Sequence, residues 1–237
     1  MKTISIINLK GGVAKTISSV NIGHILAAVH GFKVLLIDND KQGNASKILN
    51  RYDYSHKGTA NIMTERGTDL KEIIQQTDYE GLDIITANMN LLKANLEVLL
   101  DQQRPQQTRF KKVLEQAQRE YDYCIIDNAP DINISTINAL VAADDVLVPV
   151  TIDDFALDGL KELKEQIDNT KEDSKNGTKP FELRKNDRDY KTGDLLKMRV
   201  YKDGEWTGEI IHKEITYVLE GFEGLKEGYC ILGVKDA

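Results

Sequence analysis

Lys10-Gly11-Gly12-Val13-Ala14-Lys15-Thr16 is the stretch of sequence that decides the fold. It follows a β-branched run, Thr3 to Asn8, that has the composition of a strand. It precedes Thr16 to Val29, where apolar residues recur at helical spacing. A glycine loop between a strand and a helix presents backbone N–H groups and a helix N-terminus to an anion. The order therefore predicts a phosphate-binding loop near the start of the chain.

Continuous apolar runs that end in a carboxylate indicate further strands of a buried parallel sheet. Lys33 to Asp38 completes a strand–helix–strand unit, and Tyr123 to Asp127 has the same character. The other expected elements are strands at Leu82–Thr86 and Val146–Val150 and helices at Phe110–Arg119 and Ser135–Ala143. This alternation predicts an α/β fold with an open, doubly wound, mostly parallel sheet.

The character of the sequence changes after about Asp168. Residues 169–179 are polar and without periodicity, which is typical of a linker. Strands are expected at Leu195–Tyr201, Glu209–Leu219 and Tyr229–Val234, with Asp203-Gly204 as a hairpin turn. We therefore expect an α/β domain at 1–168, a linker at 169–179, and a small β-rich, barrel-like unit at 180–237.

The composition excludes several classes of protein. Of the 237 residues, 41% are hydrophobic and 29% charged, as in folded, soluble chains. Cys124 and Cys230 have neither disulfide-framework nor zinc-site spacing, and the four histidines lack ligand spacing. The net charge of −7 gives no basic excess that would by itself indicate nucleic-acid binding. No apolar run suits a secretory signal or a membrane span, so we expect a cytoplasmic protein without membrane contact.

The loop itself departs from the common phosphate-binding pattern. Lys15 would reach the β- and γ-phosphates, the Thr16 hydroxyl would ligate Mg²⁺, and the two glycines let the backbone approach the anion. The pattern G-x-x-x-x-G-K-[ST] is not met, because Leu9 and Ala14 occupy its two Gly positions. The loop is a variant.

The variant resembles the deviant Walker A loop, KGGxxK[ST], of the ParA/MinD superfamily of partition ATPases, and Lys10 corresponds to its additional signature lysine. Residues 34–44 resemble the family's second motif, in which a strand delivers two aspartates and a Gln-Gly beside the γ-phosphate. Residues 121–127 resemble its Walker B strand. Pro149 and the segment 155–160 follow in the family's order.

The resemblance implies ATP and Mg²⁺ as cofactors. The implied ATP-binding residues are Lys10, Gly11, Gly12, Val13, Ala14, Lys15, Thr16, Ile17 and Pro149. The implied metal-site residues are Thr16, Asp38 and Asp127. The implied catalytic residues are Lys10, Lys15 and Asp40. In such a site Lys10 reaches the partner's phosphates across an ATP-sandwich homodimer, and Asp40 orients the attacking water. The alternative interpretation is that Asp38 and Asp40 are solvated loop carboxylates, Asp127 is an ordinary strand-end aspartate and Lys10 is a surface lysine. The apolar strand that precedes Asp38 and Asp40 favours the functional interpretation.

Two substitutions and one larger difference qualify the resemblance. Ala14 replaces a frequent Gly, which is tolerable if φ stays negative there, and Ala129 replaces the first proline of D-x-P-P. The resemblance ends near Asp168, whereas complete members continue with strands and C-terminal helices that finish the sheet edge and supply basic residues for nonspecific DNA binding. Residues 176–190, 214–219 and 227–233 instead resemble parts of a small phage-associated domain related to ASCH/PUA-like β-barrels, which implies RNA or nucleotide binding.

Three functions are compatible with this sequence. The first is a ParA-like ATPase that dimerises with ATP, is reset by a ParB-like partner protein, and acts in plasmid, chromosome or phage DNA partition. The second is a nucleotide-binding adaptor that holds ATP without turnover and contacts nucleic acid through its C-terminal module. The third is a fusion remnant without a selected activity, whose uncovered sheet edge favours aggregation.

Overall fold

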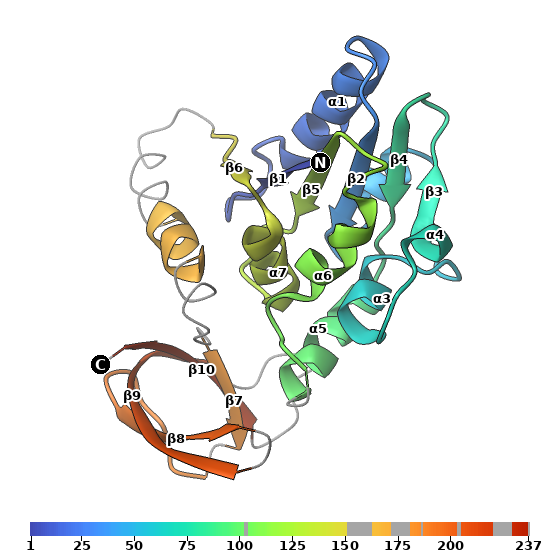
Figure 1. Cartoon of the computed structure of the whole chain (residues 1–237). Helices are drawn as coiled ribbons and strands as arrows, with labels where there is room; N and C mark the ends of the chain where they lie inside the picture. Colours follow the sequence, from blue (N-terminus) through green and yellow to red (C-terminus); the bar gives the residue numbers. More distant parts are fainter. Residues whose placement is uncertain are drawn as a thin grey trace. The chain divides into compact units, whose positions relative to one another are not determined.

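The computed structural model describes residues 1–101, 104–150, 163–171, 181–185, 187–202, 205–219 and 229–236. The chain divides into two compact units, Met1–Glu172 and Asp173–Ala237 (Figure 1). Residues 169–171, which we expected to begin a linker, are helical. The rest of that expected linker lies outside the described residues.

The first unit is built on a six-stranded sheet in the order β3-β4-β2-β5-β1-β6. The strands are β1 (Lys2–Ile6), β2 (Val34–Asn39), β3 (Ile74–Gln76), β4 (Leu82–Ile85), β5 (Tyr123–Asn128) and β6 (Asp145–Leu147). All neighbours are parallel except β3 and β4. The carboxyl ends of β1, β2 and β5 therefore meet at one edge, where the loops that follow these strands converge.

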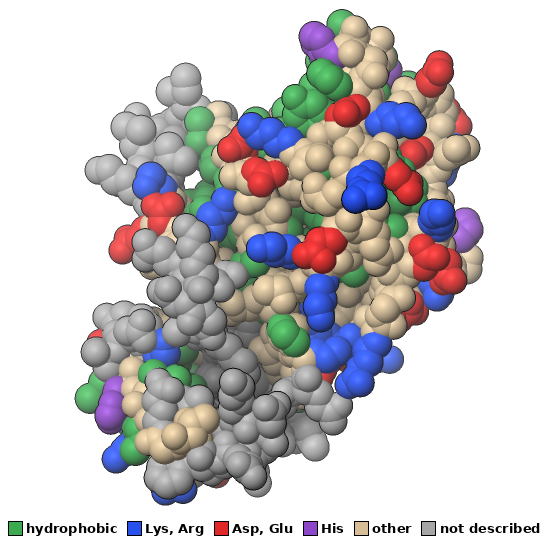
Figure 2. Space-filling view, in the orientation of Figure 1, with side chains coloured by type: hydrophobic (Ala, Val, Ile, Leu, Met, Phe, Trp, Pro, Cys, Tyr) green, Lys and Arg blue, Asp and Glu red, His purple; other side chains and the backbone are tan. Residues whose placement is uncertain are grey.

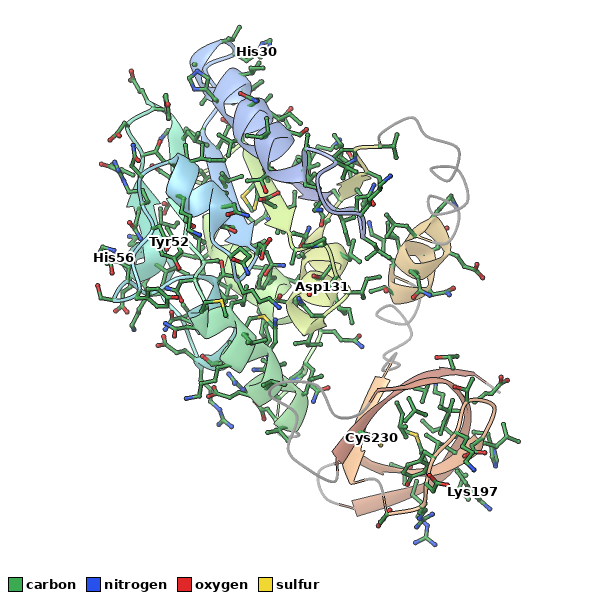
Figure 3. All side chains as sticks on the ribbon, turned by 180° about the vertical axis from the view of Figure 1, so that it is seen from behind. His30, Tyr52, His56, Asp131, Lys197 and Cys230 are labelled. Atoms are coloured by element: carbon green, nitrogen blue, oxygen red, sulfur yellow. The ribbon has the colours of Figure 1, made fainter. Side chains whose placement is uncertain are left out.

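Helices cover both faces of this sheet. They are α1 (Lys15–Ala28), α2 (Asn44–Ile48), α3 (Thr59–Thr64), α4 (Leu70–Ile73), α5 (Asn90–Leu100), α6 (Arg109–Leu114), the 3-10 turn η1 (Glu115–Ala117) and α7 (Ile134–Ala142), followed by helical residues 163–171. Figures 1 and 3 view the unit from opposite sides and show α1 and α2 on one face and α5, α6 and α7 on the other. In the described parts of the chain, no helix is long and apolar enough to cross a membrane.

The sheet is rigid because its central strands are apolar on both faces. Every residue of β2 is buried, including the run Val34–Ile37, as expected for a parallel strand between two helical layers. On α1, Gly23 allows close contact, since a Cβ there would lie 3.2 Å from Leu82 Cδ1. The strand ends that carry the predicted aspartates are thus fixed by packing.

The predicted fold class is confirmed, and the differences are local. The predicted helix over 110–119 ends as α6 at Leu114 and continues only as a 3-10 turn. The predicted strand 146–150 is the shorter β6. Helices α2, α3, α4 and α5 and the antiparallel edge strand β3 are additional to the prediction.

The second unit is an antiparallel sheet of four strands in the order β7-β10-β9-β8. They are β7 (Phe181–Lys185), β8 (Leu195–Lys202), β9 (Glu205–Leu219) and β10 (Tyr229–Asp236). The predicted β-rich unit is confirmed, with β9 beginning four residues earlier than expected. Lys202 pairs with Glu205 across the predicted hairpin turn 203–204, which itself lies outside the described residues. A small core contains Leu196, Ile215, Cys230, Leu232 and Val234.

Candidate nucleotide-binding site

The loop between β1 and α1 is anchored at its start by Asn8. The Asn8 Oδ1 atom accepts a hydrogen bond from Lys10 N at 2.9 Å, and Asn8 Nδ2 donates to the carbonyl of Pro149 at 2.8 Å. Two sequence-predicted residues, Lys10 and Pro149, are therefore brought to the same anchor. At the other end of the loop, Ser18 N donates to Ala14 O at 2.9 Å and starts the hydrogen-bond ladder of α1.

Ala14 has a left-handed backbone, with φ 63° and ψ 24°. The condition under which we considered alanine tolerable at this position, a negative φ, is therefore not met. The loop must turn sharply to direct α1 back along the sheet, and the left-handed conformation that accomplishes this is the one that glycine adopts at least cost. Ala14 is exposed, so the methyl group meets solvent and the cost lies in the backbone alone.

Lys15 is the buried cation of the site. It is 8% exposed, and its Nζ donates to the carbonyl of Lys10 at 3.1 Å. Burial lowers the pKa of Lys15, while the nearby carboxylates of Asp127, Asp40 and Asp131 act in the opposite direction. The structure thus places two of the predicted carboxylates, Asp40 and Asp127, near the predicted Lys15 ammonium group.

Asp127 lies at the carboxyl end of β5 and is fully buried. Ser19 Oγ lies 2.8 Å from Asp127 Oδ1, whereas Oδ2 has no hydrogen-bond partner among the described residues. Burial raises the pKa of Asp127 to about 6, against the effect of the Ser19 and Thr16 hydroxyls, which lower it. A buried carboxylate oxygen without a donor, next to a hydroxyl, is the arrangement that a hard divalent cation would satisfy.

Asp38 faces Asp127 across the paired strands β2 and β5. Its Oδ1 accepts from Asp40 N at 3.2 Å, and its Oδ2 accepts from Ser46 N at 2.8 Å and Ser46 Oγ at 2.7 Å. Burial raises the pKa of Asp38 to about 7, although these hydrogen bonds lower it. Asp38 therefore holds together the loop that follows β2.

Asp40 stands in that loop, which we call the switch loop and define as residues 40–44. It is 8% exposed, and its Oδ1 accepts from Gln42 N at 2.9 Å. Gly43 has φ 63°, and a Cβ there would lie 2.5 Å from both the Ala87 carbonyl oxygen and the Tyr52 ring. Figure 3 shows Tyr52 near α2, which follows this loop. The switch loop is therefore fixed by close packing as well as by hydrogen bonds.

Several supporting residues were not predicted from the sequence. Asn39 Nδ2 donates to Asn128 Oδ1 at 2.8 Å, and Asn128 Nδ2 donates to Ser5 Oγ at 2.8 Å, which links β2, β5 and β1 beside the aspartates. Thr59 Oγ1 donates to the carbonyl of Asp38 at 2.5 Å. Only the position of Asn39 between two aspartates is a sequence signal; Thr59 and Ser5 have none.

Asp131 is a further carboxylate at the site, in the connection from β5 to α7 (Figure 3). Asn133 Nδ2 donates to its Oδ1 at 2.6 Å. Burial raises the pKa of Asp131, and the neighbouring Lys41 ammonium opposes that rise. In the sequence Asp131 lies four residues after Asp127. This spacing alone does not distinguish a site carboxylate from an ordinary loop aspartate.

The remaining predicted residues surround this centre. Val13 is buried, whereas Gly11, Gly12 and Ile17 are exposed on the loop and the first turn of α1. The segment 155–160 lies outside the described residues. Within the described part of the chain, no group of three or more His, Cys, Asp or Glu side chains is arranged to hold a metal.

Comparison with known proteins identifies the families and relatives that this chain resembles. A family model described as an AAA domain matches residues 1–179, and one for a domain of unknown function, DUF3850, matches residues 161–234. The sporulation initiation inhibitor protein Soj of Bacillus subtilis is 41% identical over 162 residues, which are 68% of this chain and 63% of Soj. Chromosome partitioning protein ParA of Caulobacter vibrioides is 36% identical over 170 residues, 71% of this chain and 62% of that protein. The chain thus spans less than two thirds of the length of these relatives.

A solved structure of cobyrinic acid a,c-diamide synthase from Mycobacterium smegmatis, with a bound ATP analog and magnesium, shares the fold. Its TM-score is 0.66 at 29% sequence identity, over 73% of this chain and 69% of that one.

Proposed function

The chain belongs to the AAA domain family of ParA- and Soj-type partition ATPases, and from this premise we propose that its first unit binds Mg²⁺ and ATP and acts as an ATP-dependent dimerisation switch in DNA partition. The observation that carries the proposal is the buried Lys15 ammonium, placed between a glycine loop and the carboxylates of Asp40 and Asp127. A buried cation beside backbone N–H groups is the binding apparatus that a triphosphate requires.

The loop residues 10–17 and Pro149 would hold the nucleotide. Lys15 Nζ donates to the Lys10 carbonyl, and an ammonium group carries three donors, so it can also bind phosphate oxygens. The αL turn at Ala14 would direct the N-terminus of α1 toward the bound anion. Lys10 would reach the phosphates bound by a second copy of the chain.

Mg²⁺, when bound, would neutralise charge on the β- and γ-phosphates. The orphaned Oδ2 of Asp127 and the Thr16 hydroxyl fit this ion. Asp38 would support the metal site through the switch loop, because its hydrogen bonds to Asp40 N and Ser46 already commit both of its oxygens. Asp40 would orient the attacking water, since its carboxylate is held next to Lys15 and Asp127.

We extend the proposal to partners. An ATP-dependent homodimer and a ParB-like partner protein in the cytoplasm follow from the likeness to ParA and Soj. Nonspecific DNA is a further proposed partner, because the resemblance to ParA-type ATPases implies it. The second unit would contact RNA or another nucleic acid through residues 180–237 as an ASCH/PUA-like module.

Phosphate release and light scattering test the switch together. We expect ATP with Mg²⁺ to double the mass of the full chain in solution and to yield steady release of phosphate. Asp40→Ala should abolish phosphate release while ATP-driven dimerisation persists. Glu80→Ala, which removes an exposed carboxylate far along the sequence from the loop, is the control and should leave both readouts unchanged. Equal turnover by Asp40→Ala and the unmodified chain would contradict the role given to Asp40.

The second candidate is the hydrolysis-deficient adaptor, in which the first unit holds ATP without turnover. Dimerisation without any phosphate release from the unmodified chain would select the adaptor. Absence of ATP binding would select the fusion remnant.

A further inference from the structure

A cavity in the first unit lies apart from the nucleotide loop. It has a volume of about 470 Å³ and is formed by α3, the loop after α3, the loop before α6, and α6. Ile62, Pro105 and Val113 give it an apolar lining, and none of its lining residues belongs to the loop 10–17 or to the strand-end aspartates. A cavity of this size accommodates a small organic molecule.

Two arginines in the wall of this cavity are held in fixed positions. Arg104 donates from Nε to Asp101 Oδ2 at 2.8 Å, and from its terminal nitrogens to the carbonyls of Glu65 at 3.0 Å and Thr64 at 2.7 Å. The carbonyls belong to the C-terminal end of α3, where helical carbonyls lack partners within the helix. Arg104 is therefore fixed by the backbone of α3.

Arg109 is held in the same way and is more deeply buried. Its side chain is 6% exposed, and it donates to Asp101 Oδ2 at 2.8 Å, to Pro105 O at 3.2 Å and to the Met63 carbonyl. A guanidinium has five N–H donors. Arg104 and Arg109 each use three of them, so each keeps two N–H groups without an acceptor among the described residues.

The charge in the cavity wall is unbalanced. Arg104 and Arg109 share one carboxylate oxygen, Asp101 Oδ2. The pKa of Arg109 is lowered first by burial and then by the positive charge of Arg104. Two cations on one carboxylate repel each other in a partly buried site, and an anion in the cavity would relieve this repulsion.

Two further cations stand at the cavity. Arg66 and Lys112 both line it and are both exposed. The one acidic residue in the lining, Glu65, is paired with Lys57 at 3.4 Å. Figure 2 shows Lys and Arg side chains gathered on this face of the unit, over the region of α3, α5 and α6. The cavity thus combines an apolar lining with an excess of positive charge.

We propose that this cavity binds a small organic anion, an apolar or aromatic body that carries a phosphate group, at a site separate from the nucleotide loop. The phosphate would meet the unused N–H groups of Arg104 and Arg109 together with Lys112, and the apolar body would lie against Ile62 and Val113. Because the two guanidiniums are already fixed, little side-chain entropy is lost on binding.

Calorimetric titration of the full chain with phenyl phosphate tests the proposal. We expect saturable binding that weakens about tenfold in Lys112→Ala, since this substitution removes a charged partner of the anion. Lys111→Ala is the matched control, because Lys111 is exposed on the same helix, α6, and does not line the cavity. It should bind like the unmodified chain.

Two more titrations distinguish this cavity from the nucleotide loop and from a site for phosphate alone. Lys15→Ala must retain binding, because the cavity does not include the nucleotide loop; loss of binding there would place the ligand on the loop and overturn the proposal. Inorganic phosphate should bind more weakly than phenyl phosphate, and equal binding would contradict a role for the apolar lining. The proposal would also be overturned if phenyl phosphate showed no saturable binding up to about 10 mM. It would likewise be overturned if the chain bound duplex DNA but not phenyl phosphate.

Discussion

Replacing Ala14 by glycine should stabilise the first unit. Ala14 has φ 63°, a left-handed conformation that costs an L-residue roughly 1–2 kcal/mol and costs glycine almost nothing. Glycine makes the unfolded chain more flexible, which returns about 0.4–1 kcal/mol of that gain. Because Ala14 is exposed, no buried contact is lost. The expected net increase in the free energy of unfolding is about 0.5–1 kcal/mol.

Thermal unfolding of the full chain, followed by far-ultraviolet circular dichroism, measures this effect. All helices among the described residues belong to the first unit, so the helical signal reports that unit. For a unit of this size the midpoint should rise by about 2–4 °C per kcal/mol. Trp206, the single tryptophan, lies in β9 of the second unit, and its fluorescence transition should not move.

Asn50→Gly is the matched control for the substitution at Ala14. Asn50 is also left-handed, with φ 54°, and is exposed, but asparagine tolerates this conformation better than alanine does. Its midpoint should rise less than that of Ala14→Gly. An unchanged or lower midpoint for Ala14→Gly, with both transitions cooperative, would refute the reasoning from backbone strain.

Two other perturbations follow from the site. Gly43→Ala should destabilise the first unit by about 2 kcal/mol or more, because the added Cβ meets the Ala87 carbonyl and the Tyr52 ring at a positive φ. Gly67 also has a positive φ but faces open space, so the control Gly67→Ala should cost only about 1 kcal/mol. Equal losses of unfolding free energy in urea denaturation would exclude the steric explanation. The ligand-free protein should lose stability as pH rises from about 4 to 7, because native Asp38, with a pKa of about 7, still binds a proton that the unfolded chain has released. The loss is on the order of a few kcal/mol, and Asp38→Asn should reduce the slope of unfolding free energy against pH; an unchanged slope would place the titrating group elsewhere.

The sheet was predictable from sequence because its strands are buried on both faces. The runs that became β2 and β5 are continuously apolar and end in aspartates, so the same residues mark both the strand and the site. The position of the glycine loop between β1 and α1 was also predictable, because a Gly-Gly and Lys-Thr sequence between a strand and a helix is typical of a phosphate-binding loop.

Other parts of the first unit lacked so direct a signal. α5 has apolar residues at Leu91, Ala94 and Val98, which is helical spacing that sequence reasoning could have used. α3 has six residues and α4 has four, too few for a period to show, and tertiary contacts hold them, such as the bond from Thr59 to the Asp38 carbonyl. β3 is an edge strand that pairs antiparallel with β4. Its three residues are too few to indicate the strand direction from sequence.

The candidate site was predictable where a residue type carries its own chemistry, and it was not where partners are distant in sequence. Lys15, Asp38 and Asp127 follow from motif and strand end. The pairing of Asn39 with Asn128, 89 residues away, and the shared use of Asp101 by two arginines depend on how elements meet in space. The left-handed backbone at Ala14 also required the structure, because sequence alone allowed either sign of φ there.

Calorimetric titration of the full chain with ATP in the presence of Mg²⁺ tests the central claim most directly. We predict saturable binding that weakens about 10- to 100-fold in Lys15→Ala, because the buried ammonium makes charged hydrogen bonds to phosphate. Lys71→Ala, at an exposed lysine on α4, should bind like the unmodified chain. Equal affinities in Lys15→Ala and the unmodified chain would contradict a nucleotide site at this loop.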